Sequence, residues 1–163
     1  MARKLVVACI FTALFLLNGL VCYAETGVTV GKTLPQFTLS ALDGQSVTVG
    51  PSDQVTVINF WATWCPPCRG EMPDLNAFYL QYQGKVNFYA IDLQEDSGKV
   101  KSFMQNNGYS MPVLLDTDGE IGNLFHIQAI PTTIIVDRNG VIQFVQRGAT
   151  NRAQLENRVN QLL

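Results

Sequence analysis

The feature that most constrains this chain is a pair of cysteines in the segment Trp64-Cys65-Pro66-Pro67-Cys68. The pair directly follows an apolar, β-branched and aromatic run that predicts a buried strand, and it precedes a helical pattern. Both prolines suit a first helical turn, where a missing N–H has no intrahelical partner to lose. A sulfur at a helix start meets unpaired N–H groups and the positive end of the helix dipole, which stabilise its thiolate. The pattern therefore predicts a redox dithiol at a strand-to-helix junction.

Two other uses of the cysteine pair are disfavoured. A loop of two intervening residues removes little entropy from the unfolded chain, so a purely structural disulfide would stabilise the fold poorly. A zinc site needs two further Cys or His ligands, and the only histidine is His126. The remaining cysteines, Cys9 and Cys22, lie in an apolar N-terminal segment. We therefore expect no metal, and no cofactor beyond the redox-active disulfide Cys65–Cys68.

The N-terminal segment up to Ala24 predicts a targeting signal. Arg3 and Lys4 precede a long apolar stretch that ends in small residues, which is the anatomy of a signal peptide. A retained N-terminal membrane anchor and a lipoprotein acylated at Cys22 are the alternatives. Under each of them residues 1–24 are the targeting segment, and residues 25–163 form one domain outside the cytoplasm.

The order of periodic segments predicts an α/β fold with a mixed sheet. Asp-Gly at 43–44 predicts an N-terminal hairpin, and Asp-Arg-Asn-Gly at 137–140 predicts a second hairpin near the C-terminus. Asn151 and Gln154 have the spacing of a capping box before the last helix. We expect strands at 36–39, 46–49, 55–61, 86–93, 112–115, 132–136 and 141–145, and helices at 66–83, 97–107, near 120–125 and from 151 onward.

The charge pattern argues against nucleic acid as a partner. The formal net charge is −2, from 11 basic and 13 acidic residues, and the basic residues are scattered. A small acidic cluster of Asp92, Glu95 and Asp96 follows a predicted strand end. We expect this cluster to be a solvated loop that caps the next helix.

The motifs, taken in order, resemble the thioredoxin superfamily, and within it the TlpA-like branch of ResA and CcmG/DsbE type extracytoplasmic thiol-disulfide oxidoreductases. The segments that carry the resemblance are GKTLPQFTL at 31–39, DG at 43–44, NFWATWCPPCRGEMP at 59–73, IPTT at 130–133 and DRNG at 137–140. Together they span nearly all of residues 31–163. The resemblance implies a thioredoxin-like fold, which is a central mixed β-sheet flanked by helices, with an added N-terminal β-hairpin. It also implies that Pro131 is cis and lies opposite the dithiol.

The candidate catalytic residues are Cys65, Cys68 and Glu71. Cys65 is the expected nucleophile at the exposed helix start, and Cys68 should resolve the mixed disulfide. Glu71 lies three positions after Cys68, on the same helix face, where it would accept the thiol proton or tune the thiol pKa. The alternative is an acid that only favours the helix dipole. Thioredoxin itself carries a buried aspartate where this chain has Asn59, and an amide does not take up a proton.

The candidate substrate-binding residues surround the cysteine pair and are Trp64, Pro66, Pro67, Ile130 and Pro131. We expect Ile130 to present a backbone edge to a bound polypeptide, so that the partner sulfur lies beside Cys65. Trp64 either shields the disulfide or serves as packing material.

Three functions from different classes remain. The first is a periplasmic or otherwise extracytoplasmic monomer that reduces protein disulfides, for example in apocytochrome c during cytochrome c maturation, and is recharged by a membrane thiol-disulfide electron donor. The second is a thiol peroxidase, since peroxiredoxins share the opening hairpin, although the Pro-x-x-x-Thr/Ser-x-x-Cys peroxide cradle is missing. The third is a non-enzymatic thioredoxin-fold module that uses its thiols to bind copper or a partner. The direction of electron flow depends on the reduction potential of the pair.

Overall fold

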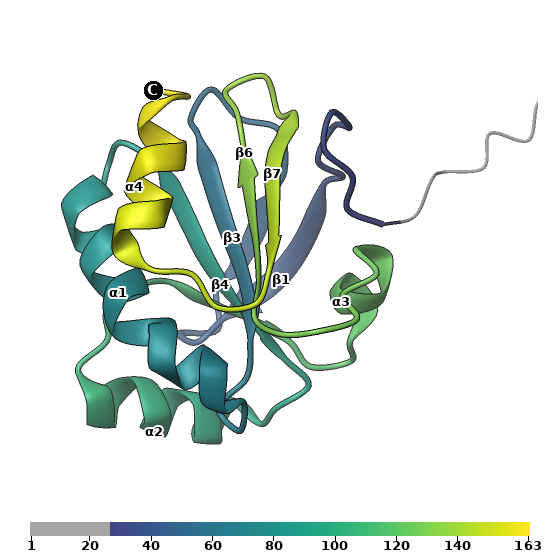
Figure 1. Ribbon diagram of the computed structural model, residues 1–163. Helices are drawn as coiled ribbons and strands as arrows, with labels where there is room; N and C mark the ends of the chain where they lie inside the picture. The colour runs from purple at the N-terminus through teal and green to yellow at the C-terminus, as the bar shows by residue number, and fades with distance from the viewer. Residues whose placement is uncertain (1–26) are drawn as a thin grey trace, which may run out of the picture.

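The computed structural model describes residues 27–163, which form a seven-stranded mixed sheet with helices on both faces (Figure 1). The strand order is β2-β1-β5-β4-β3-β6-β7. The three central strands β3, β4 and β5 are parallel, whereas β1–β5, β1–β2, β3–β6 and β6–β7 pair antiparallel. The mixed sheet and the β1–β2 hairpin confirm the expected fold class. The predicted targeting segment lies outside the described residues.

The elements lie close to where the sequence predicts them. The strands are β1 (Phe37–Ala41), β2 (Ser46–Val49), β3 (Thr56–Trp61), β4 (Asn87–Leu93), β5 (Val113–Asp116), β6 (Thr132–Val136) and β7 (Ile142–Arg147). The helices are α1 (Pro66–Tyr82), α2 (Ser97–Asn107), α3 (Glu120–Leu124) and α4 (Arg152–Asn160). No helix in this part of the chain is long and apolar enough to cross a membrane.

Strand β3 is buried at every position because both faces of the sheet are covered. Val57 and Trp61 belong to a core that includes the buried faces of α1, α2 and α4. Ile58 and Phe60 belong to a second core with α3 on the opposite face, and Figure 1 shows α1 and α4 on one side of the sheet and α3 on the other. Side chains alternate along a strand, so Asn59 faces α1 together with Val57 and Trp61.

Helix caps fix the ends of the helices that carry or surround the dithiol. Asp96 caps α2 by accepting hydrogen bonds from two backbone N–H groups, and Gly108 ends this helix with a left-handed backbone at φ 67°. The predicted capping box of α4 is confirmed, because Asn151 Oδ1 accepts from the Gln154 N–H at 3.0 Å and Gln154 Oε1 accepts from the Asn151 N–H at 3.2 Å.

The expectation of a solvated acidic loop is wrong for two of its three residues. Asp92 is 1% exposed and Glu95 is 7% exposed, and only Asp96 has the expected capping role. Asp92 shares its strand face with Phe88 and Ala90, which belong to the core under α1 and α2. Because β4 lies between β3 and β5, the last inward-facing position of the strand stays buried even though it is polar.

Candidate active site

The dithiol lies where β3 leads into α1, as the sequence predicts. Cys65 and Cys68 form a disulfide with an S–S distance of 2.09 Å and a Cα–Cα distance of 5.3 Å. Cys65 is the N-cap of α1 and has an extended backbone, and the two prolines that follow occupy the first helical positions. Cys65 Sγ accepts a hydrogen bond from the Cys68 N–H at 3.3 Å. The helix start therefore offers a donor to this sulfur, which favours its thiolate in the reduced protein.

Cys65 is less exposed than expected, at 3%. Its sulfur is bonded to the buried Cys68 and lies 3.8 Å from the carbonyl oxygen of Ile130, so both groups cover it in the oxidised state. Trp64 is 62% exposed, and Pro66 and Pro67 are exposed beside it. The indole is therefore not core packing, and the apolar surface beside the disulfide is open to a partner.

The loop before β6 lies against the dithiol, as the resemblance implies. The Ile130–Pro131 peptide bond is cis, and the Ile130 carbonyl is the one next to Cys65 Sγ. The Gly148 N–H donates to the Pro131 carbonyl oxygen at 2.8 Å, and the Thr132 hydroxyl donates to the Ala129 carbonyl oxygen at 2.7 Å. These bonds anchor both sides of the loop, which leaves Ile130 half-buried at its tip.

Glu71 lies on the buried face of the dithiol helix α1 and is held at both carboxylate oxygens. The Asn59 side-chain amide donates to Glu71 Oε1 at 2.8 Å and to Thr133 Oγ1 at 3.0 Å. The Thr150 backbone N–H donates to Glu71 Oε2 at 2.7 Å. An acid that only favoured the helix dipole would lie at the surface of the first turn, but this one is 2% exposed.

The surroundings of Glu71 act on its pKa in opposite directions. Burial raises the pKa, because an apolar environment disfavours the charged carboxylate. The hydrogen bonds from Thr150 and Asn59 lower it, and burial is the larger effect. A carboxylate with a raised pKa is a better match for a thiol proton than an exposed glutamate.

Sequence reasoning missed two residues of this polar network: Thr133, which accepts from Asn59, and Thr150, which donates to Glu71. Thr133 is 74 residues from Asn59, and Thr150 is 79 residues from Glu71, so no local pattern links them. The fold brings them together, because β6 pairs with β3 and the segment after β7 reaches the side of α1. Thr133 lies inside the quoted IPTT motif, which was a usable signal, whereas Thr150 had none.

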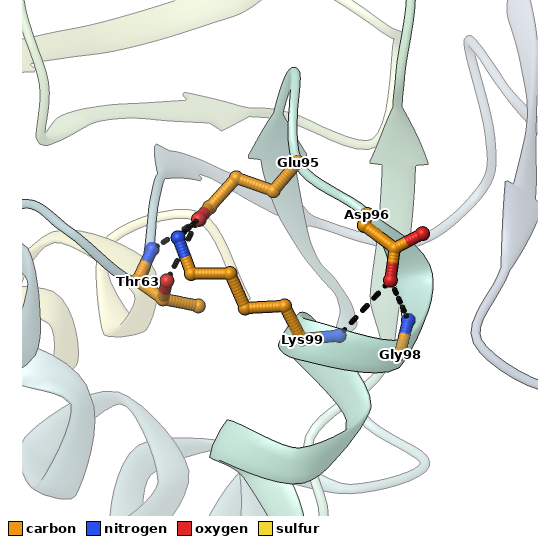
Figure 2. A network of polar contacts seen from close by, with 5 residues as sticks. All are labelled: Thr63, Glu95, Asp96, Gly98 and Lys99. Atoms are coloured by element: carbon orange, nitrogen blue, oxygen red, sulfur yellow. Dashed lines mark hydrogen bonds and ion pairs between the residues drawn. The ribbon is translucent and has the colours of Figure 1, made fainter.

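The loop that precedes Cys65 has a polar support of its own. Glu95 Oε2 accepts from the Thr63 N–H at 2.5 Å, and Glu95 Oε1 accepts from the Thr63 hydroxyl at 2.7 Å. Figure 2 shows Lys99 reaching the same carboxylate while Asp96 turns away to cap α2. Within residues 27–163 no group of three or more His, Cys, Asp or Glu side chains could hold a metal ion.

The fold and the site define a class. A mixed sheet flanked by helices, with a C-x-x-C disulfide at the start of α1 and a cis-proline loop against it, is the arrangement of a thioredoxin-like thiol-disulfide oxidoreductase. The Redoxin family profile matches residues 29–163, and the chain belongs to this family.

Relatives and solved structures agree with this assignment. The chain is 31% identical over 134 residues to "Thiol-disulfide oxidoreductase ResA" of Geobacillus thermodenitrificans, covering 81% of this chain and 77% of the relative. It is 25% identical over 155 residues to "Sporulation thiol-disulfide oxidoreductase A" of Bacillus subtilis, covering 90% and 94%. The structure of a putative thiol:disulfide interchange protein DsbE from Chlorobium tepidum matches with a TM-score of 0.76 at 25% identity, covering 83% of this chain and 99% of that one. These similarities support the TlpA-like branch of thiol-disulfide oxidoreductases.

Proposed function

We propose that this protein is an extracytoplasmic reductase of protein disulfides, with Cys65 as the attacking thiol, Cys68 as the resolving thiol and Glu71 as the acceptor of the Cys68 proton. The observation that carries the proposal is the buried Glu71 carboxylate, one helical turn beyond Cys68 and held by Asn59 and Thr150. Such a group serves a thiol that must lose a proton away from water.

The expected cycle moves two electrons to the partner. The Cys65 thiolate attacks one sulfur of the partner disulfide, and the other partner sulfur leaves and takes up a proton. Cys68 then gives its proton to Glu71, and its thiolate attacks Cys65 Sγ. The partner sulfur released from Cys65 takes up the second proton, so the partner leaves as a dithiol, and the Cys65–Cys68 disulfide is the product state seen in this structure. A membrane thiol-disulfide donor would reduce the pair again.

The surface around the pair supports a polypeptide as the substrate. Trp64, Pro66 and Pro67 are exposed next to the disulfide in the chain, and the half-buried Ile130 has its carbonyl oxygen 3.8 Å from Cys65 Sγ. An extended segment that pairs with the backbone of the Ile130 loop would bring its sulfur to Cys65. We further propose the haem-binding cysteines of apocytochrome c as one such partner, on the strength of the resemblance to the ResA and CcmG/DsbE type.

Trapping of the mixed disulfide tests the mechanism. A reduced Cys68→Ala variant should accumulate a covalent complex with extracytoplasmic proteins that carry disulfides, because no second thiol releases the partner. A Cys65→Ala variant should form no such complex through this site. Absence of any complex with Cys68→Ala, or an equal yield with Cys65→Ala, would count against the assigned roles. Reduction of an apocytochrome c disulfide by the intact protein tests the named partner separately.

A further inference from the structure

A second buried acid, Glu95, holds the loop that presents Cys65. Both of its carboxylate oxygens accept from one residue, Thr63, through the backbone N–H at 2.5 Å and the hydroxyl at 2.7 Å. Thr63 lies two residues before Cys65, in the short connection between β3 and α1. Figure 2 shows the Glu95 side chain reaching from the loop after β4 toward Thr63. The position of this connection therefore depends on a residue from the loop between β4 and α2.

The charge of Glu95 is stabilised where it lies. Lys99 Nζ is 2.5 Å from Glu95 Oε1, although the lysine side chain is 57% exposed. Burial alone would raise the pKa of Glu95, but the hydrogen bonds from Lys99 and Thr63 outweigh it, and the pKa is lowered. Glu95 is therefore a carboxylate at neutral pH. Charge-assisted hydrogen bonds of this kind are about twice as strong as neutral ones.

Asp92 is a buried acid beside this carboxylate. It is 1% exposed, and no N–H or hydroxyl donor of ordinary geometry reaches its carboxyl oxygens in the part of the chain that the structure describes. Its carboxyl faces that of Glu95, to which a protonated Asp92 donates. The register partner of Asp92 in β3 is Trp61, whose indole nitrogen is buried without a partner among the described residues. Burial, and next the neighbouring Glu95, raises the pKa of Asp92 to about 8. Asp92 is thus a neutral carboxylic acid near pH 7.

The ionisable groups around Asp92 come from few elements. Glu95, in the loop after β4, raises its pKa, and Lys99, from α2, lowers it. Its paired neighbours on the two adjacent strands, Trp61 of β3 and Leu115 of β5, do not titrate in this range. On α1 the buried ionisable groups are Glu71 and Tyr82, and their hydrogen bonds are made with other residues.

We propose that Glu95 is a positioning residue for the dithiol: it holds the loop that presents Cys65 to a partner, and the protonation of Asp92 controls how firmly it does so. While Asp92 is neutral, Glu95 stays in place against Thr63. When Asp92 ionises, two buried carboxylates repel each other, and Glu95 withdraws from the loop. The inference rests on the proposed function only in taking Cys65 as the attacking thiol.

Hydrogen exchange at the Thr63 amide in the full chain tests the hydrogen bond to Glu95 directly and does not depend on activity. Between about pH 7 and about pH 9, the wild type should lose about tenfold of its protection beyond the intrinsic pH effect. Asp92→Asn, which stays neutral, should keep its protection at both values. Glu95→Ala should lose protection at both by about tenfold or more, and Glu95→Gln should regain part of it through its carbonyl oxygen. Asp96→Asn is the matched control, since it removes a neighbouring charge but keeps a capping oxygen.

The second readout is the rate at which reduced Cys65 attacks a protein disulfide, followed by mass spectrometry that resolves it from the other cysteines. We expect Glu95→Ala to slow this attack about tenfold, with Glu95→Gln partly restored and Asp96→Asn unchanged.

Equal loss of Thr63 protection in wild type and Asp92→Asn would overturn the role of Asp92. If wild type and Glu95→Ala reduce the protein disulfide at the same rate, the positioning role of Glu95 is overturned. A wild type that attacks no protein disulfide, yet shows the expected exchange pattern, would overturn the proposed function and leave the hold on the loop supported.

Discussion

Glu71 combines burial with two hydrogen bonds, and in the proposed mechanism it accepts the Cys68 proton. Glu71→Gln keeps the size of the side chain but takes up no proton. We expect release of the partner from the mixed disulfide to slow by about tenfold or more, because resolution then lacks its base. The initial attack by Cys65 should change far less. Single-turnover kinetics with a labelled protein disulfide would separate the two steps.

Asp74→Asn is the matched control for this prediction. It removes one negative charge from the same helix, and Asp74 is only half-buried. Its resolution rate should match that of the wild type. Equal slowing in both variants would mean that net charge near α1 matters, and not proton transfer to Glu71.

Asp92 should make the stability of the protein depend on pH. Its pKa is raised from 3.8 to about 8 in the folded state, so between these values the folded protein holds a proton that the unfolded chain has lost. The free energy of unfolding should therefore fall by about 1.4 kcal/mol for each pH unit from this residue, with the loss complete above about pH 8. Asp92→Asn should remove this slope. Denaturant unfolding at about pH 5 and about pH 8 measures it, and an unchanged slope in the variant would contradict the assignment.

At the scale of elements, the two hairpin glycines differ in what surrounds them. Gly44 in the β1–β2 turn and Gly140 in the β6–β7 turn both have a positive φ, at 84° and 77°. A Cβ at Gly44 would meet nothing within 4 Å, whereas a Cβ at Gly140 would lie 2.5 Å from Pro51 Cβ. Gly44→Ala should cost about 1 kcal/mol from backbone strain, and Gly140→Ala clearly more, because Pro51 must also move. Equal unfolding midpoints for the two variants would refute the close packing on Pro51.

Most elements could be predicted because their signals are local. The capping box at Asn151, the helix end at Gly108 and both hairpins follow from residues within a few positions of one another. Burial at a strand end is not a local property, which is why the prediction of a solvated loop is wrong for Asp92 at the end of β4 and for Glu95 after it. Whether Asp92 faces water depends on β3 and β5 beside it and on the helices above, and none of these can be read from the residues around position 92.

At the scale of the whole molecule, the order of motifs predicted the fold and the pairing of the dithiol with the Ile130–Pro131 loop. The strand order explains why the loop meets the dithiol. Strands β3 and β6 are antiparallel neighbours, so the end of β3 and the start of β6 lie side by side. The motifs do not predict the hydrogen bonds that hold Glu71. Asn59 can be aligned with the thioredoxin aspartate by position, but its link to Glu71, and the link of Glu71 to Thr150, exist only in the folded chain.

The central claim is that the dithiol gives electrons to protein disulfides, and its reduction potential tests this most directly. Equilibration of the protein with a thiol couple of known potential, with the Cys65–Cys68 state read by mass spectrometry, yields the value. A reductant should lie toward thioredoxin, at about −270 mV, so that the dithiol form transfers electrons to most partners. A value near that of the strong oxidant DsbA, about −120 mV, would contradict the account, because the disulfide would then take electrons from its partners.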